Sequence, residues 1–259
     1  MVIGDFGSGS EDMDDIAGAV RDEDERAALD AVVTTGDNIY PDGTASYFEE
    51  AWLEPYGWVQ DESIPVLASL GNHDVEVDAD AVMELLDMPA RWYVETVGPV
   101  EFVVLDSTVV ADPGQRSFLE RVLDAPKETG VPFRVVVMHH SPHSCSLHQS
   151  NQEILRTWVP SFEHGAVDLV LSGHDHVYER FGPIDGITFV VTGGGGYELH
   201  DVGDCPSGTP APESAAEEFH YVLIEATREE LRLQAISSGG ELVDTFTLDR
   251  RTSSHNSTL

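Results

Sequence analysis

Short apolar runs bounded by turn residues recur along the chain, and this pattern predicts buried β-strands. The runs that we interpret as strands cover residues 1–3, 31–35, 64–70, 91–97, 100–105, 133–138, 167–172, 187–191, 219–225, 231–236 and 242–248. Between several of them apolar residues recur at helical spacing, which predicts helices within residues 16–29, 78–86, 113–123 and 154–162. Strands that alternate with helices indicate an α/β fold.

Two segments stand out between these elements. Residues 197–217 are rich in Gly, Pro, Ser and acidic residues, which predicts a long loop over the functional site. Aromatic residues crowd the segment 47–58, where either helix and loop packing or a stacking site for substrate explains them; they are Tyr47, Phe48, Trp52, Tyr56 and Trp58. Because no linker or repeat interrupts the pattern, we expect a single domain over residues 1–248 and a disordered tail over residues 249–259.

The charge balance is strongly acidic and restricts the partners of the protein. Asp and Glu number 48 against 13 Lys and Arg, a formal net charge of -35, and Lys127 is the single lysine. This charge argues against nucleic acid and anionic membrane as partners. A hydrophobic content of 41% still predicts a packed fold, and the combination is typical of a halophile. At roughly 1 M salt the Debye length falls to about 3 Å, so we expect unfolding on dialysis to low salt.

The cysteines and the ends of the chain bear on its compartment. Cys145 and Cys205 lack the spacing of a zinc site, and both two free thiols and a disulfide remain open. No signal peptide and no apolar stretch of membrane-spanning length is seen, which indicates a cytoplasmic protein. The first strand is shorter than a usual central strand. We therefore expect a natural start upstream of Met1, and such a start would leave room for an export signal.

Five of the apolar runs are followed directly by side chains that bind hard metal ions. These side chains are Asp5, Asp37, Asn72, His139 and the pair His174 and His176. Open α/β sheets bind their ligands at the carboxyl ends of the strands. Carboxylate, amide and imidazole donors suit iron, manganese or zinc, and such mixed ligation is typical of hydrolytic centres with two ions. The two oxygens of Asp37 make it the natural bridge between two ions.

The five motifs resemble those of the calcineurin-like metallophosphoesterase superfamily, and within it the purple acid phosphatase branch. The motifs are Gly4-Asp5-Phe6-Gly7, Gly36-Asp37-Asn38-Ile39-Tyr40, Gly71-Asn72-His73-Asp74, Val136-Val137-Met138-His139 and Gly173-His174-Asp175-His176. Most of the superfamily has a ligating histidine where this chain has Gly7, and Tyr40 replaces it as in the purple enzymes. The resemblance implies a four-layer α/β/β/α sandwich of two mixed sheets flanked by helices.

The resemblance also implies the two metal ions. It assigns Asp5, Asp37, Tyr40 and His176 to a first ion and Asp37, Asn72, His139 and His174 to a second. A tyrosinate ligand favours Fe(III) at the first position, with a visible charge-transfer colour. The second position takes Fe(II), Zn(II) or Mn(II) in this family.

The activity that the resemblance implies is hydrolysis of small-molecule phosphate monoesters by attack of a metal-activated hydroxide. His73 matches the active-site histidine of the family, and we expect it to contact phosphate and protonate the leaving group. His148, or less favourably His143, assists in this interpretation. Asp74 orients His73 and Arg180 braces the loop after His176, and the alternative for both is an ordinary fold contact. Two alternatives stay open: a phosphodiesterase or nucleotide hydrolase on the same centre, and a non-catalytic metal-binding protein.

Overall fold

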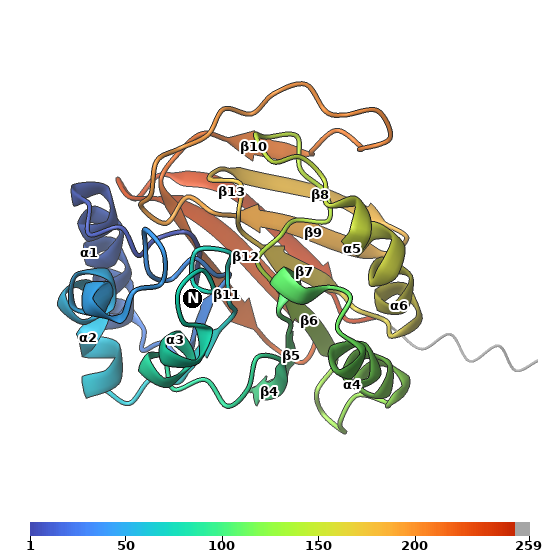
Figure 1. Ribbon diagram of the computed structural model, residues 1–259. Helices are drawn as coiled ribbons and strands as arrows, with labels where there is room; N and C mark the ends of the chain where they lie inside the picture. The colour runs from blue at the N-terminus through green and yellow to red at the C-terminus, as the bar shows by residue number, and fades with distance from the viewer. Residues whose placement is uncertain (252–259) are drawn as a thin grey trace, which may run out of the picture.

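The computed structural model describes residues 1–251 and contains two β-sheets that face each other (Figure 1). Within these residues, the first sheet has the strand order β13-β12-β11-β1-β2-β3. Its strands are β1 (Val2–Ile3), β2 (Val32–Thr34), β3 (Val66–Ala68), β11 (His220–Ala226), β12 (Glu230–Ser237) and β13 (Leu242–Asp249). The strands β1, β2 and β3 run parallel, and β11, β12 and β13 are antiparallel, so the sheet is mixed.

The second sheet has the order β10-β8-β9-β7-β6-β5-β4. Its strands are β4 (Tyr93–Val97), β5 (Val100–Val104), β6 (Phe133–Val137), β7 (Leu169–Ser172), β8 (Tyr178–Ile184), β9 (Ile187–Thr192) and β10 (Ser214–Ala216). A parallel centre of β5, β6, β7 and β9 is flanked by antiparallel edges. This sheet is therefore also mixed.

Helices cover the outer faces of both sheets. In Figure 1, α1 (Glu11–Arg26) and α2 (Glu54–Asp61) lie outside the first sheet, and α4 (Pro113–Asp124), α5 (Gln152–Thr157) and α6 (Val159–His164) lie outside the second. Shorter helices are η1 (Ala45–Tyr47), η2 (Glu49–Leu53), α3 (Ala79–Leu85) and η3 (Ser107–Val109). The expected four-layer α/β/β/α sandwich is confirmed. Over residues 1–251, no helix has the length and apolarity needed to cross a membrane.

Strand β6 carries apolar side chains on both of its faces, apart from the buried Arg134, which pairs with Glu101. Phe133, Val135 and Val137 belong to the core between the sheets, whereas Val136 and the following Met138 belong to the core under α4, α5 and α6. Side chains alternate between the two faces of a strand. Because both faces of β6 are covered, both sets must be apolar, as in other buried parallel strands.

Local capping signals explain where the helices begin. The Ser10 side chain accepts a hydrogen bond from the Met13 N–H at the start of α1, and Asp112 does the same for Gly114 and Gln115 before Pro113 opens α4. The prediction of one helix over residues 154–162 was wrong in one respect, since this segment forms two helices, α5 and α6, that are separated at Trp158. Pro160 lies in the first turn of α6, where a residue without an N–H is tolerated.

Three differences from the expected elements concern the C-terminal half. Strand β8 and the short β10, which lies inside the predicted loop 197–217, were not anticipated. Strand β13 extends to Asp249, and Arg251 Nε lies 3.0 Å from Asp168 Oδ1, so the chain is placed beyond the expected tail boundary. The remainder of the predicted tail, residues 252–259, lies outside the described residues.

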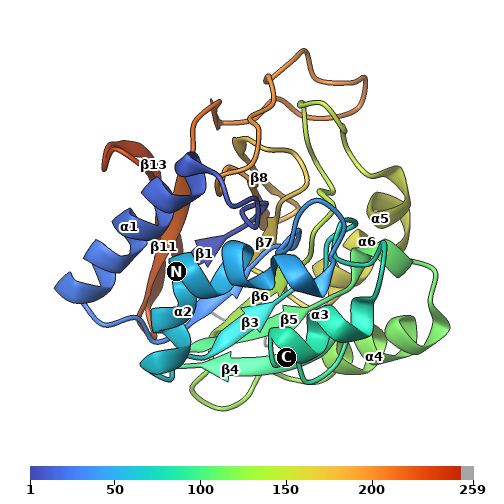
Figure 2. The ribbon, with the colours of Figure 1, turned by 60° about the vertical axis from the view of Figure 1, so that its left-hand side comes forward.

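The carboxyl ends of β1 and β2 meet those of β6 and β7 along one edge of the sandwich (Figure 2). Backbone hydrogen bonds join the loops that follow these strands: Asp5 N–H donates to Gly36 O at 3.0 Å, and Gly173 N–H donates to His139 O at 2.9 Å. Between the sheets, the His174 N–H donates to Asp5 Oδ1 at 3.1 Å, so the side chains after these four strands meet at the junction of the two sheets.

Candidate metal centre

One half of the junction gathers four of the predicted ligands. Tyr40 Oη lies 3.1 Å from Asp37 Oδ2 and 3.3 Å from His176 Nε2. His176 Nε2 in turn lies 3.4 Å from Asp5 Oδ1. These donor atoms come from the ends of β1, β2 and β7, and all four residues are buried. They match the set expected for the first ion.

The other half gathers the remaining predicted ligands around His139. Its Nε2 lies 3.0 Å from Asn72 Oδ1, 3.1 Å from His174 Nδ1 and 3.3 Å from Asp37 Oδ2. Asp37, His139 and His174 form a compact group of possible ligands. Since Asp37 Oδ2 borders both halves, its carboxylate lies where a bridging ligand is needed.

The backbone turns sharply at three of these residues. Asp5, Asp37 and His174 have φ values of 57°, 50° and 70°, in the left-handed region that non-glycine residues rarely adopt. Each such conformation costs about 1 kcal/mol or more, and such costs concentrate at functional sites. The turn aims each side chain back across the strand ends instead of along the strand.

Two glycines in the motifs make room for carboxylates from neighbouring strands. A Cβ at Gly71 would come within 2.1 Å of Asp37 Oδ1, and a Cβ at Gly173 would come within 2.2 Å of Asp5 Oδ2. The residue before Asn72 and the residue before His174 must therefore lack a side chain. The glycines of the motifs reflect contacts between strands far apart in sequence.

The histidine tautomers favour cation binding. His139 Nδ1 donates to Thr35 O at 2.9 Å, and His176 Nδ1 donates to Glu198 O at 2.6 Å. When such a ring is neutral, its proton lies on Nδ1 and the Nε2 lone pair faces the centre. Such backbone acceptors behind the ring are typical of metal-binding histidines.

The charges at the centre also favour a bound cation. Asp5 and Asp37 are 0% and 1% exposed, and within residues 1–251 histidines are their ion-pair partners, with no Lys or Arg among them. Burial opposes ionisation of Asp37, but His139 outweighs it and holds the Asp37 pKa at about 2. Burial, and then Asp5 and Asp37, raise the pKa of the Tyr40 hydroxyl far above its ordinary value. Buried carboxylates and a phenol at one point fit a cationic group between them.

His73 lies on the open side of the centre. Its ring centroid is 4.6 Å from that of Tyr40, its Nε2 is 4.0 Å from Asp37 Oδ2, and its Nδ1 is hydrogen-bonded to Pro41 O. The expectation that Asp74 orients the ring was wrong. Asp74 instead accepts hydrogen bonds from Asn38, Ile39 and Gly71, and burial raises its pKa to about 7, with Asp37 adding to the effect.

The two other candidate histidines differ in position. His148 is exposed and stacks on His174 with ring centroids 4.0 Å apart, so it lies over the second half of the centre. His143 packs against Phe181 and Phe189 in the core, which removes it as a candidate. Arg180 pairs with Asp244 and Glu213, so it connects β8 to β13 and to the loop before β10.

Sequence reasoning missed a layer of side chains over the first half. The Tyr197 ring stacks on Tyr40, with centroids 3.9 Å apart and planes at 6°. The His200 ring stacks on His176 at 4.0 Å, and its Nδ1 accepts the His176 N–H. Both residues belong to the predicted loop 197–217. The loop was predicted correctly, but composition alone carried no signal for which of its residues face the centre.

A disulfide joins this layer to the loop that carries His148. Cys145 and Cys205 form an S–S bond of 2.09 Å, which resolves the alternative that the sequence left open. His148, Asp175 and His200 also lie close enough to form a ligand group. However, Asp175 Oδ1 already accepts the His148 N–H, and His200 Nδ1 is used by His176. We therefore assign this group to the support of the centre.

Comparisons with known proteins identify the family of the chain. The model of the calcineurin-like phosphoesterase family matches residues 1–178. Purple acid phosphatase 4 of Arabidopsis thaliana is 27% identical over 227 residues, which cover 75% of this chain and 67% of that protein. Purple acid phosphatase 3 of the same plant is 26% identical over 236 residues, which cover 79% of this chain and 64% of that protein. The chain thus spans about two thirds of the length of these relatives.

Solved structures share the fold at low identity. A purple acid phosphatase from yellow lupin seeds superposes with a TM-score of 0.80 at 19% identity, covering 96% of this chain and 53% of that chain. GAP50, described as the anchor in the inner membrane complex of Plasmodium, superposes with a TM-score of 0.84 at 17% identity, covering 97% and 88%. Since a phosphatase and an anchor share this architecture, the fold alone does not decide activity.

Proposed function

Because the chain belongs to the calcineurin-like phosphoesterase family, we propose that it is a two-metal phosphatase that hydrolyses small-molecule phosphate monoesters. The observation that carries the proposal is the position of Asp37. Its Oδ2 lies 3.1 Å from Tyr40 Oη and 3.3 Å from His139 Nε2, so one carboxylate borders both groups of donors. This is the arrangement that a two-ion hydrolytic centre needs.

In this proposal Asp5, Asp37, Tyr40 and His176 hold the first ion, and Asp37, Asn72, His139 and His174 hold the second. The phenol and carboxylates favour Fe(III) in the first group, and the nitrogen-rich second group suits Fe(II), Zn(II) or Mn(II). When bound, the two ions would offset phosphate charge and lower the pKa of bound water.

The charge of the centre fits a phosphate monoester. Asp5, Asp37 and a Tyr40 phenolate contribute three negative charges, against five positive charges of a trivalent and a divalent ion. The surplus of about two matches a monoester dianion. Since the exterior is acidic, with a net charge of -35 for the chain, attraction of the substrate must come from the centre itself.

His73 is proposed to contact phosphate and to donate a proton to the leaving oxygen. Its Nδ1 is held by Pro41 O, and its Nε2 lies on the same side of the ring as Asp37. His148, stacked on His174, is proposed to assist from the opposite wall. General acid catalysis of this kind contributes about 10²- to 10⁴-fold to the rate.

The test combines metal analysis, a visible spectrum and hydrolysis of glycerol 2-phosphate and phenyl phosphate, in molar salt because of the acidic surface. We expect two ions per chain and a coloured protein, with the colour lost in Tyr40→Phe. His73→Ala should lower kcat for glycerol 2-phosphate about 10²-fold or more and for phenyl phosphate less, because phenolate departs more readily without a proton.

The matched control is His164→Ala, since the His164 side chain is 73% exposed and pairs only with Asp124 among the described residues. It should leave metal content and kcat unchanged. An unchanged kcat in His73→Ala would refute the role of His73. Faster turnover of diesters than of monoesters would show that the enzyme is a phosphodiesterase. No turnover after full metal loading would favour a non-catalytic protein.

A further inference from the structure

A hollow of about 200 Å³ adjoins the proposed centre on the side of the first ion. Gly7 and Gly9 border it without side chains, and Tyr40, Pro41, Tyr47 and Tyr197 border it with rings. Ligand pockets typically combine apolar or aromatic walls with a few polar groups. The size suits one substituted ring.

The hollow connects to the reacting groups through two of its wall residues. Tyr40 contributes its hydroxyl to the centre, 3.1 Å from Asp37 Oδ2, and its ring to the hollow. Pro41 borders the hollow and binds the His73 ring through its carbonyl oxygen. A leaving group that receives a proton from His73 would therefore extend over Pro41 into this space.

Tyr47 differs from the aromatic residues that follow it in the chain. Phe48, Trp52 and Tyr56 are 7%, 1% and 0% exposed and belong to the core, whereas Tyr47 is 41% exposed. Core packing thus explains those three, but it leaves Tyr47 unexplained. On the hollow's other side, Tyr197 is held flat against Tyr40 at 3.9 Å. The fixed ring of Tyr197 and the exposed ring of Tyr47 both border the hollow, and such walls favour a flat ligand.

The charge around the hollow further restricts the leaving groups that it can bind. Among the described residues, Glu50 is its one charged wall residue, and no Lys, Arg or His of residues 1–251 borders it. Glu50 is exposed, and its side chain lies near Gly9. A negatively charged leaving group, such as a further phosphate or a carboxylate, would meet repulsion from Glu50 and from the acidic surface.

We propose that this hollow binds the leaving group and selects phosphate monoesters of flat aromatic alcohols that are neutral or positively charged. The proposal rests on the proposed phosphatase function. Tyr47 and Glu50 are its specificity-determining residues: the Tyr47 ring packs on the leaving group, and the Glu50 carboxylate favours a cationic substituent and rejects an anionic one.

The first test compares phenyl phosphate with glycerol 2-phosphate. Tyr47→Ala should lower the ratio of kcat/KM for phenyl phosphate to that for glycerol 2-phosphate about three- to tenfold, chiefly through a higher KM for the aryl ester. Tyr47→Phe should keep the wild-type ratio, because the ring remains. The control Leu53→Ala removes a side chain of 42% exposure from η2 outside the hollow and should also keep the ratio.

The second test compares phenyl phosphates that carry a 4-aminomethyl or a 4-carboxyl group. The wild type should prefer the amine, and Glu50→Gln should reduce this preference about two- to fivefold, as for an exposed ion pair. Glu49→Gln is the matched control, because Glu49 is also exposed but does not border the hollow.

The outcomes separate this proposal from the phosphatase function. Hydrolysis of glycerol 2-phosphate with an unchanged ratio in Tyr47→Ala, or with equal changes in Tyr47→Ala and Leu53→Ala, overturns the aromatic site and leaves the phosphatase standing. An equal effect of Glu50→Gln and Glu49→Gln overturns the charge selection. Wild-type protein that is loaded with metal and hydrolyses neither ester overturns both.

Discussion

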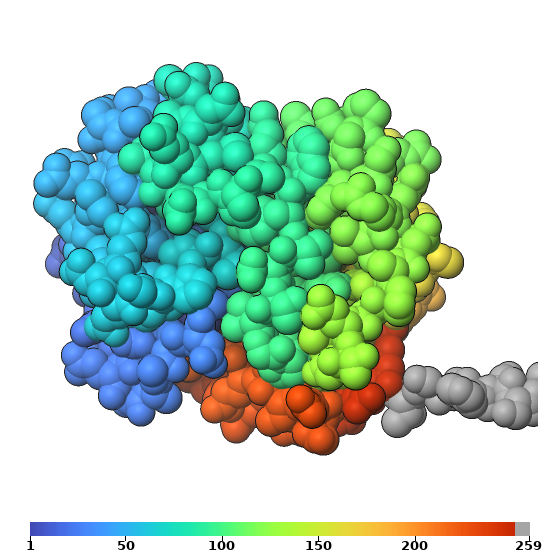
Figure 3. Space-filling view, turned by 90° about the horizontal axis from the view of Figure 1, so that it is seen from below, coloured from blue at the N-terminus to red at the C-terminus, as the bar shows by residue number. Residues whose placement is uncertain are grey.

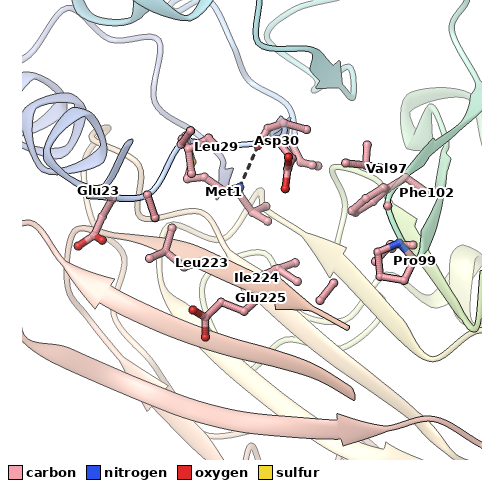
Figure 4. Close-up of a pocket in the computed structure, with 18 residues that line it drawn as sticks. Met1, Glu23, Leu29, Asp30, Val97, Pro99, Phe102, Leu223, Ile224 and Glu225 are labelled. Atoms are coloured by element: carbon pink, nitrogen blue, oxygen red, sulfur yellow. Dashed lines mark hydrogen bonds between the residues drawn. The ribbon is translucent and has the colours of Figure 1, made fainter. Parts of the chain in front are cut away.

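The two ends of the β-sandwich bury opposite kinds of side chain. At the carboxyl ends of the strands the sheets meet over Asp5, Asp37, His139 and other polar groups. At the opposite end, an apolar crevice of about 290 Å³ lies between β11, the C-terminal end of α1 and the β4–β5 turn, bordered by residues such as Leu29, Phe102 and Leu223 (Figure 4). Figure 3 shows the N-terminal segments in blue close to the C-terminal strands in orange.

The difference teaches that an apolar hollow and a reactive site need not coincide. Among residues 1–251, neither of the two groups of possible metal ligands lies at the crevice. The metal end has left-handed backbone at three residues and carboxylates without Lys or Arg partners in the described chain. Such features lower stability, so the apolar packing elsewhere must offset them. Substitutions at the two ends should therefore separate activity from stability.

The largest effect is expected for Asp37→Asn. The change removes the carboxylate shared by both donor groups, so activity should fall about 10³-fold or more and metal content should drop. Metal-free protein should also lose stability, because His139 holds the Asp37 pKa below its ordinary value and the ionised pair therefore stabilises the fold above about pH 4. Elemental analysis, monoester assays and urea unfolding without metal check this. Full metal occupancy with normal activity would contradict the bridging role.

At the other end, Phe102→Ala should act on stability alone. Phe102 is 6% exposed and packs in the core between the sheets. Its removal should lower the free energy of unfolding by about 3–5 kcal/mol. Metal content and kcat of the folded protein should stay at wild-type values, as measured in molar salt. Loss of metal from the folded variant would show that the two ends are coupled.

Removal of the disulfide near the metal end should lower the free energy of unfolding somewhat less. Cys145 and Cys205 are 60 residues apart in sequence, and opening such a loop costs roughly 3–4 kcal/mol of stability. The Cys145→Ser/Cys205→Ser variant should also show faster amide hydrogen exchange over residues 143–150 and 197–205. Unchanged exchange in these segments would mean that other contacts alone hold them over the centre.

The smallest expected effect is on the pH dependence of stability, and it comes from a buried carboxyl group under the loop that carries His148. Glu179 is 0% exposed and accepts hydrogen bonds from Ser144 Oγ at 2.9 Å and Cys145 N–H at 3.1 Å. Burial raises its pKa from 4.5 to about 7. Between these values the unfolded chain has released the proton and the folded chain still holds it, so stability falls as pH rises and the loss is complete above about pH 7.

Glu179→Gln should remove this contribution, which is on the order of 2–3 kcal/mol between pH 4.5 and 7. Urea unfolding of metal-free protein at pH 5 and pH 7.5 measures it. The exposed Glu49→Gln serves as the control and should leave the pH dependence as in the wild type. An equal slope in wild type and Glu179→Gln would show that Glu179 is already ionised at pH 5 in the folded protein.

Much of the fold followed from local patterns. Short, nearly continuous apolar runs identify buried strands such as β6, helical spacing and caps such as Asp112 locate helices, and turn residues mark the strand ends. Since carboxyl ends of parallel strands share an edge, the positions of Asp5 and Asp37 after β1 and β2 already placed these two together, whereas His139 follows a strand of the other sheet. Strand β8 escaped prediction because it directly follows the His174 and His176 turn, where the apolar pattern is interrupted.

The sequence by itself indicated an α/β fold, because local periodicity reveals strands that alternate with helices, and it showed metal-binding side chains after five apolar runs. The four-layer architecture and the two sets of proposed ligands followed from the resemblance of the five motifs to a known family. Only the tertiary structure decided that Tyr197 stacks on Tyr40, that Cys145 pairs with Cys205, that Asp74 serves the loop rather than His73, and that Tyr47 faces a hollow. These contacts depend on how side chains from distant segments pack against one another. Local patterns restrict each segment, but they do not specify which segments meet.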